Sequence, residues 1–394
     1  MKTVPPPRNA APSARKTWKQ DLAVHLEVDA RRSLGQIASV VLPYVGIWLL
    51  AWQLRPDPWL AVGLGLVATL FLVRMYSLFH DLTHNSMFES RVANRRWGYL
   101  LGFLLFTPYR WWQRQHSLHH AHTGNLDKRG PGEIYTMTLA EYRRASPGRR
   151  IGYRAYRNPL LMLFVGPSLV FLFARRFPQR GMTPRILFSV LLTNVALAGW
   201  ALGWALLLGW PTYVLIQGTT LVAGGAVAAW MLYIQHQYED TYYQSSRGWR
   251  FEDAALRGSS YLRLPRGLVW VVGNANYHHV HHLSAKIPNY NLRAAHDEHA
   301  IFARTPVVTL RSSIDALRLK LWDEQRGCLV SYPALRSSRK SAEVEFRCFT
   351  TPGAVPIDGC HEHDAPRRRR GARGRGRRFW GEAPTSPAGT PAAR

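Results

Sequence analysis

The chain has 394 residues, a formal net charge of +27 and hydrophobic side chains at 47% of its positions. On a soluble protein this charge would indicate nucleic-acid binding, but four long segments are almost free of charge. Residues 33–54, 59–79, 186–209 and 212–235 contain one charged residue between them, Arg74. Each is long enough to cross a hydrocarbon core of roughly 30 Å, which takes about 20 apolar residues. We therefore expect an integral membrane protein, with no nucleic-acid partner.

In chain order, residues 1–32 are polar and basic, and the apolar run after them is too long for the core of a signal peptide. Only a short turn separates the first two spans, and only Trp210 and Pro211 separate the last two. Nearly all Lys and Arg lie in residues 1–32, 80–185 and 236–394. Since basic segments stay in the cytosol, we expect both termini there and two helix hairpins that open toward the cytosol.

Two shorter apolar segments, residues 97–112 and 159–173, are expected to be interfacial or re-entrant helices. If either crossed alone, the segments around it would fall on opposite faces of the membrane. Arg74 is expected to reach the cytosolic interface by snorkelling. We predict three regions: a cytosolic N-terminal segment (1–32), a membrane domain (33–338), and a disordered tail rich in Pro, Gly and Arg (339–394).

Ten of the 16 histidines fall in three short segments, residues 80–84, 116–122 and 278–282. Residues three and four apart lie on one face of a helix, so each segment can direct two or three imidazoles toward one point. A further histidine follows directly after the fourth span. The predicted metal ligands are His80, His84, His116, His119, His120, His236, His278, His281 and His282. They suffice for two metal ions with open positions.

The other histidines do not share this pattern. His122 and His279 break the spacing within their segments, and we interpret them as outer or surface residues; His25, His296 and His299 are interpreted as ordinary surface or core histidines. Imidazole binds Zn, Cu, Fe and Ni alike, so ligand type does not name the metal. Ligating histidines need acceptors for their other ring nitrogen. Candidates for such acceptors are Asp81, Glu239 and Asp240, for which ordinary ion pairs are an equal alternative, and Asn274 is a separate candidate for a contact behind the ligands.

Longer runs around these histidines carry a resemblance. They are HHAHTGNLD at residues 119–127, QHQYEDTY at 235–242, and GNANY at 273–277, which leads through the third segment into LSAKIPNY at 283–290. The chain resembles the membrane fatty-acid desaturase family across roughly residues 35–335, and within it the bacterial acyl-lipid Δ5/Δ12 (omega-6) branch. The resemblance implies an all-α fold with four transmembrane helices, interfacial helices and a cytosolic histidine-rich cap. It also implies two iron ions, O2 and a membrane-lipid acyl chain as substrate.

The electrons for such a reaction would come from outside the chain. The sequence has three cysteines without a CxxC pair, no G-x-G-x-x-G after a strand, and no His-Pro-Gly-Gly motif. We expect a ferredoxin or flavodoxin as donor, and a bacterial inner membrane as location. The alternatives are a lipid or carotenoid hydroxylase or ketolase, a catalytically inactive lipid sensor, and a metal transporter. A transporter would place its ligands inside the spans, where the polar residues are essentially Asn194 and Gln217.

Overall fold

The four predicted spans are four long helices in the computed structural model, which describes residues 17–333 except 131 and 180. They are α2 (Ala30–Leu54), α3 (Pro58–His84), α9 (Pro184–Leu208) and α10 (Trp210–His236). All four are long and apolar enough to cross a membrane. The prediction of an all-α integral membrane protein with four transmembrane helices is therefore confirmed, and α3 and α10 continue past the predicted apolar segments to end at histidines.

Local signals set the ends of these helices. Asp29 caps α2 and Asp57 caps α3, each accepting two hydrogen bonds from backbone N–H groups of the first turn. α3 ends at Asn85, whose φ of 54° is left-handed, a conformation that Asn tolerates well. Gly209, with a φ of 82°, stands between α9 and α10. Because the connections are so short, α2 packs on α3 and α9 packs on α10.

α3 and α10 form the most extensive helix contact in the molecule. Small residues let their backbones approach closely, as is common for helices in membranes. A Cβ on Gly65 would lie 2.8 Å from the carbonyl oxygen of Ile216, and one on Gly224 would lie 2.5 Å from Leu72. The hydroxyl of Thr220 also donates to the carbonyl of Gly65 at 3.1 Å. This contact fixes the position of α10 relative to α3.

The two shorter apolar segments each form broken helices. α4 (Arg91–Leu104) and α5 (Tyr109–His122) are separated by a turn and both pack on α9. α7 (Pro147–Tyr156) is followed by two π-helical turns, η2 (Leu161–Val165) and η3 (Val170–Ala174), with α8 (Gly166–Leu169) between them. The bend between α7 and residues 161–174 is 64°, and the pair is apolar enough to span only when both parts are counted. Their interfacial placement stays a prediction.

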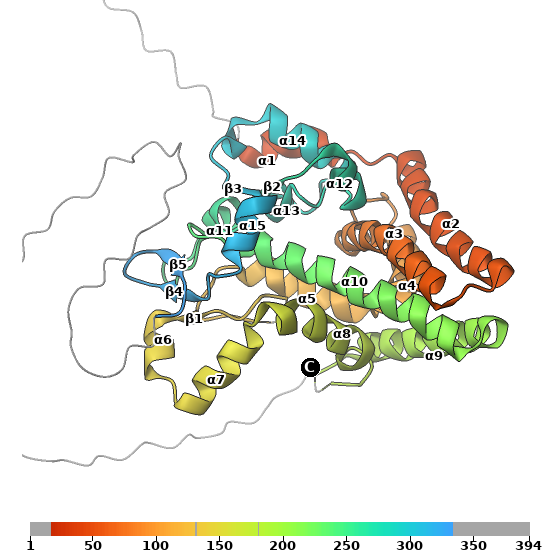
Figure 1. The fold of residues 1–394 in the computed structure, drawn as a ribbon. Coiled ribbons are helices and arrows are strands. Elements are labelled where there is room, and N and C mark those ends of the chain that lie inside the picture. Colours follow the sequence, from red (N-terminus) through yellow and green to blue (C-terminus); the bar gives the residue numbers. More distant parts are fainter. Residues whose placement is uncertain (1–16, 131, 180, 334–394) are drawn as a thin grey trace, which may run out of the picture. The chain divides into compact units, whose positions relative to one another are not determined.

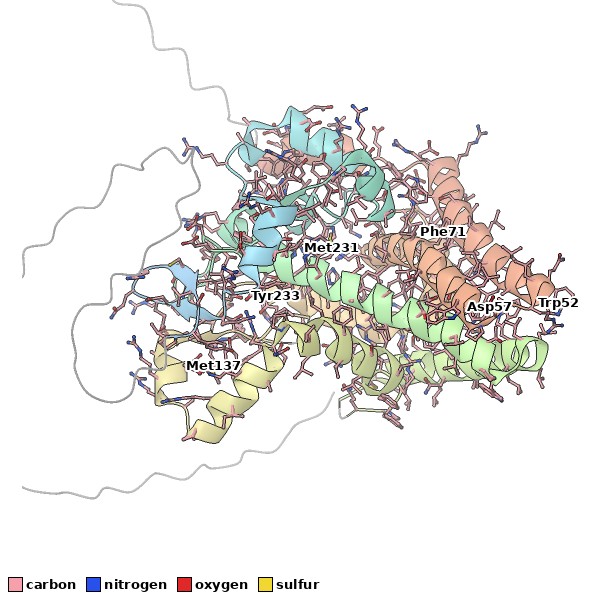
Figure 2. The ribbon with its side chains drawn as sticks, in the orientation of Figure 1. Trp52, Asp57, Phe71, Met137, Met231 and Tyr233 are labelled. Carbon is pink, nitrogen blue, oxygen red and sulfur yellow. The ribbon has the colours of Figure 1, made fainter. Side chains whose placement is uncertain are left out.

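Short elements make up the rest of the described chain. The helical ones are α1 (Trp18–Asp21), η1 (Leu22–Leu26), α6 (Leu139–Arg144), α11 (Phe251–Arg257), α12 (Arg266–Val271), α13 (His278–Leu283), η4 (Asn289–Asn291), α14 (Leu292–Glu298), η5 (Ala300–Phe302) and α15 (Leu310–Ala316). Most of them gather near the end of the bundle where α10 finishes (Figure 1). Figure 2 places Trp52 and Asp57 toward the other end and Tyr233 beside these short elements.

Two small sheets, which the sequence did not predict, tie this region together. β4 (Leu321–Asp323) pairs in parallel with β1 (Met137–Thr138) and antiparallel with β5 (Cys328–Val330). β2 (Tyr261–Arg263) pairs in parallel with β3 (Val307–Thr309). Each strand has at most three residues, too few for the alternation of polar and apolar side chains that reveals a strand in a sequence.

Arg74 is buried, donates to the carbonyl of Trp270 and stacks on that indole ring at 4.6 Å. α12 folds back over α3 and supplies this acceptor. The position of Arg74 at the cytosolic interface stays a prediction. The predicted tail, residues 339–394, lies outside the described residues, and the three-region division stays a prediction.

Candidate metal centre and lipid cavity

The nine predicted ligands come together in two groups. The five-histidine cluster contains His80, His84, His116, His120 and His281, and the four-histidine cluster contains His119, His236, His278 and His282. Within each cluster, one nitrogen from every ring lies within 4.8 Å of one from every other ring. The nine residues selected by helical spacing and by position after the fourth span are the nine that make up these two clusters.

Four helices deliver these side chains. The last turn of α3 carries His80 and His84, and the last residue of α10 is His236. α5 and α13 each contribute to both clusters, because their histidines three and four apart point toward neighbouring positions. The two spanning helices therefore hold one side of the site, and two shorter helices close it.

The ring nitrogens within each cluster lie close to one another. In the five-histidine cluster, the Nε2 atoms of His116 and His281 each lie 3.0 Å from Nε2 of His120. In the four-histidine cluster, Nε2 of His278 lies 3.0 Å from that of His236 and 2.9 Å from that of His282. Two nitrogens that bind one ion at about 2.0–2.1 Å are roughly 2.9–3.4 Å apart for angles of about 90° to 109°. The spacing fits shared metal ligands.

Unpartnered nitrogens point to the same conclusion. Nε2 of His84 and Nε2 of His119 are buried and have no hydrogen-bond partner within the described part of the chain. A buried polar atom without a partner is costly, and a metal ion in each cluster would satisfy it. Burial also lowers the pKa of His119 and His281 well below the ordinary value, with neighbouring imidazoles adding to the effect. The rings are then neutral at pH 7, the form that binds metal. Each cluster could hold a metal ion.

Contacts behind the imidazoles only partly match the predicted outer residues. Asp81 Oδ1 lies 3.4 Å from Nδ1 of His80, and Asp81 Oδ2 accepts from the backbone N–H and the side chain of Asn289 at 2.8 and 2.9 Å. Asn274 is one step farther out, since its amide donates to the carbonyl of Asn289 at 3.0 Å. Asp81 is thus placed to orient His80, with Asn274 behind it.

The other two predicted carboxylates lie elsewhere. Asp240 is exposed and Glu239 is half-buried; across residues 17–333, no hydrogen bond or ion pair joins either carboxylate to a cluster histidine. The backbone carbonyl of Glu239 instead accepts from Leu329 at 2.9 Å. The sequence missed the partners that the four-histidine cluster does have: the carbonyl of Gly258, 2.8 Å from Nδ1 of His236, and the hydroxyl of Thr123, 3.4 Å from Nδ1 of His119.

The histidines with irregular spacing lie outside both clusters. His279 is fully buried, and its Nε2 faces Nδ1 of His296 at 2.9 Å. His122 is half-buried on α5. A carbonyl has no sequence signature, which explains why Gly258 could not be identified, whereas a threonine four residues after His119 was a signal that could have been used.

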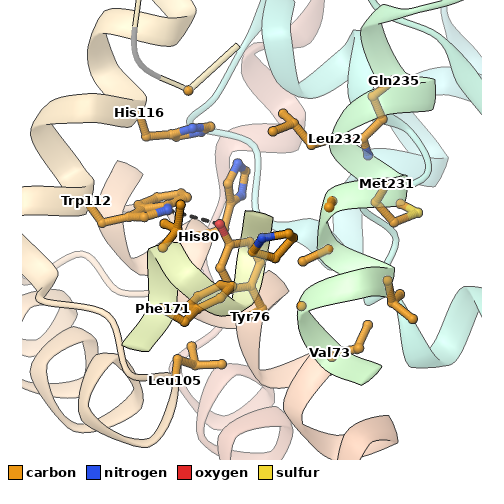
Figure 3. Close-up of a pocket in the computed structure, with 18 of the residues that line it drawn as sticks. Val73, Tyr76, His80, Leu105, Trp112, His116, Phe171, Met231, Leu232 and Gln235 are labelled. Atoms are coloured by element: carbon orange, nitrogen blue, oxygen red, sulfur yellow. Dashed lines mark hydrogen bonds between the residues drawn. The ribbon is translucent and has the colours of Figure 1, made fainter. Parts of the chain in front are cut away.

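An apolar cavity of about 700 Å³ leads away from the histidines. Its upper wall in Figure 3 carries His80 and His116, and its lower part is lined by Val73, Leu105 and Phe171. Other lining residues come from α10 and from the bent segment 161–174. The indole N–H of Trp112 donates to the hydroxyl of Tyr76 at 3.0 Å. Because these two polar groups satisfy each other, both aromatic rings present apolar faces to the cavity. The cavity therefore joins the two histidine clusters to an apolar region lined by the candidate spans α3 and α10.

Glu133 is a cavity residue that the sequence gave no reason to select. Its Oε1 is buried with no hydrogen-bond partner among the described residues. Burial raises the pKa of this carboxyl to about 8, so the group is mostly protonated at neutral pH. Glu133 accordingly adds a neutral polar group, not a negative charge, to the cavity wall.

Comparison with known proteins agrees with this site. A family model described as fatty acid desaturase matches residues 57–312. A "Fatty acid desaturase" of Bacillus subtilis (strain 168) is 38% identical over 323 residues, covering 82% of this chain and 92% of the relative. An "sn-1 oleoyl-lipid 12-desaturase" of Synechocystis sp. is 26% identical over 285 residues, covering 66% and 72%. The chloroplastic "Omega-6 fatty acid desaturase" of Spinacia oleracea is 25% identical over 284 residues, covering 68% and 59%.

The matched region contains all three histidine segments, His236, and the four spanning helices except α2. It thus includes every residue of the two clusters and every residue that lines the cavity. Sequence similarity, four membrane-spanning helices and the paired histidine clusters lead to one conclusion: the chain belongs to the fatty acid desaturase family.

Proposed function

We propose that this membrane protein is an O2-dependent desaturase that introduces a double bond into a lipid acyl chain at a di-iron centre. The observation that carries the proposal is the position of the two histidine clusters at one end of an apolar cavity. A chain of methylene groups has no polar handle near the bond to be changed, so it must be positioned by the shape of an apolar cavity. The names of the relatives favour an acyl chain esterified in a membrane lipid.

The five-histidine cluster would hold one iron ion and the four-histidine cluster the other. Neutral imidazoles supply no negative charge, so an iron pair held there would remain cationic, and Asp81 would be the nearby carboxylate that partly compensates it. The iron pair would supply the O2 chemistry needed to break an unactivated C–H bond. The protein's own contribution is to orient the imidazoles, exclude water, and hold the acyl chain against His80, His116 and His281 in the cavity wall.

Electrons would come from a ferredoxin or flavodoxin, which are typically acidic. The exposed side chains of Arg143, Arg144 and Arg149 on α6 and α7 offer a basic surface for such a partner. We further propose that this surface and the histidine clusters face the cytosol of a bacterial inner membrane, because the loops that carry them are rich in Lys and Arg.

The test is expression in a host with saturated membrane lipids, together with a ferredoxin system. We expect new double bonds by mass spectrometry of fatty acid methyl esters, and none with His281→Ala. His122→Ala is the matched control, since this histidine is in neither cluster. Hydroxylated chains in place of unsaturated ones would overturn the desaturase assignment. Metal analysis that finds one zinc ion per chain and no iron would overturn the di-iron centre.

A further inference from the structure

A third group of potential ligands lies outside the two histidine clusters. It consists of His25, from the segment before the first span, and Glu298 and His299, at the end of α14. Their ligand atoms lie within 4.8 Å of one another. None of the three belongs to the cavity wall or to the proposed iron site. From the sequence, both histidines are expected to be ordinary surface or core residues, since each stands alone; in the fold they meet although 274 positions separate them.

The geometry of this group matches that of the two clusters. Nε2 of His25 faces Nε2 of His299 at 2.9 Å, the same spacing that recurs between ligating nitrogens in the five- and four-histidine clusters. The two rings meet edge-on at 88°. Glu298 Oε2 approaches the same Nε2 of His25 at 3.5 Å. Two nitrogens and one carboxylate oxygen therefore converge on one point.

The surrounding contacts hold His25 in place. Its side chain is only 7% exposed, and the side chain of Asn291 donates to the backbone carbonyls of His25 and Glu27, both at 3.1 Å. Leu22 packs into an apolar group with Leu292 and Phe302. Glu298, by contrast, is 62% exposed, so the point between the three groups is open to solvent on one side. A cation could enter from that side and meet ligands that are already positioned.

We propose that His25, Glu298 and His299 form a third metal site that takes a divalent cation of the zinc class. Two imidazoles and one carboxylate are a common zinc ligand set, with a fourth position left for water. A direct N–H···N hydrogen bond between the two imidazoles would account for their spacing, but it does not use the carboxylate. The ion would fasten residues 17–29, immediately before α2, to α14 in the C-terminal half of the chain. This inference does not depend on the proposed function.

The experiment uses the full-length protein, purified in detergent and loaded with iron, then titrated with Zn²⁺ against a chromophoric chelator. We expect one zinc ion per chain beyond the iron, with iron content unchanged in the same samples. His25→Ala and His299→Ala should each lose this zinc ion. Glu298→Gln, at an exposed position where folding is not at risk, should weaken zinc binding by at least about tenfold.

Asp297→Asn is the matched control, because Asp297 is the adjacent carboxylate and pairs with Arg293 at 3.3 Å. It should bind zinc as the unmodified chain does. As a second measurement, zinc should slow trypsin cleavage after the exposed Lys19 in the unmodified chain but not in His299→Ala. If the unmodified chain binds no extra zinc, or if all three variants bind it equally, the two imidazoles are only hydrogen-bonded and the proposal is wrong.

Discussion

The five-histidine and four-histidine clusters are built from the same side chain in different surroundings. His80, His84, His116 and His120 of the five-histidine cluster are partly exposed, and a carboxylate, Asp81, contacts one of its rings. All members of the four-histidine cluster are buried, and their outer partners, Gly258 and Thr123, are neutral. The first site gains charge compensation and the second gains shielding from water. The comparison suggests that outer contacts, more than ligand type, distinguish the two positions.

The largest effect should come from removing a ligand from either cluster. His84→Ala and His282→Ala should each reduce double-bond formation at least about 100-fold, because direct ligands matter more than outer partners, whose loss costs about 10–100-fold. Product is measured as unsaturated fatty acid methyl esters, and iron is measured per chain. If either variant keeps more than about a tenth of the activity, the cluster that it disrupts is not needed for the reaction. The two clusters would then differ in function as well as in their surroundings.

Asp81→Asn tests the one charged outer contact. It should lower activity about 10–100-fold, since the substituted amide cannot supply the negative charge beside His80. Thr123→Val should have a smaller effect, because the Thr123 hydroxyl also bonds to the carbonyl of His119 at 2.6 Å, so its main contact is with its own helix. Melting temperatures of both variants control for the lost contact between Asp81 and Asn289. Equal losses in the two variants would remove the distinction between charged and neutral outer partners.

Acid should destabilise the metal-free protein through both clusters alike. Burial lowers the pKa of His116, His120 and His281 in one cluster and of His119, His278 and His282 in the other. The unfolded chain binds protons at these positions below about pH 6.5, whereas the folded chain stays neutral. The free energy of unfolding is therefore highest above about pH 6.5. Below that pH it falls by up to about 1.4 kcal/mol per pH unit for each histidine.

Thermal unfolding of the metal-free protein between about pH 7.5 and 5.5 measures this slope. His119→Asn and His281→Asn should each reduce the slope by about one proton, and His122→Ala should leave it unchanged. If only one of the two substitutions reduced the slope, the two clusters would differ in how strongly they make stability depend on pH. A melting temperature independent of pH would mean that the imidazoles bind protons in the folded state as they do in the unfolded chain.

The smallest effect is expected at Glu239 and Asp240. Both were predicted from the sequence to contact the histidines, but neither carboxylate does so in the part of the fold that the structure describes. Glu239→Gln and Asp240→Asn should change activity less than about twofold, because substitutions at such sites are usually nearly neutral. The same methyl ester measurement is used, with Asp81→Asn as the reference for an outer carboxylate in contact with a ring. A loss close to that of Asp81→Asn would show that Glu239 or Asp240 reaches the site during turnover.

Much of the fold and the site was predictable because it rests on local periodicity. Long uncharged segments located the four spans, and spacings of three and four residues selected eight of the nine cluster histidines. His236 required only its position after the fourth span. These features follow from helix geometry, which is the same in a sequence and in a folded protein.

The remaining features depend on contacts between distant segments. Arg74 is buried because α12 returns to cover it, the Gly258 carbonyl is aimed at His236 by the turn after α11, and β2 and β3 are too short to leave a pattern. His25 meets His299 across 274 positions. No local rule relates such residues, so only the folded structure could show them together.

The separation of the ligands along the chain has a consequence for how the protein is made. His120 and His281 face each other at 3.0 Å but are 161 positions apart. At roughly 5–20 residues per second, a ribosome needs on the order of ten to thirty seconds to pass from one to the other. During that interval His116 and His120 already have His80 and His84 in the chain, whereas His119 still lacks His278 and His282 of α13. Neither cluster is complete until α13 has emerged, so the proposed metal ions would gain their full ligand sets only late in biogenesis.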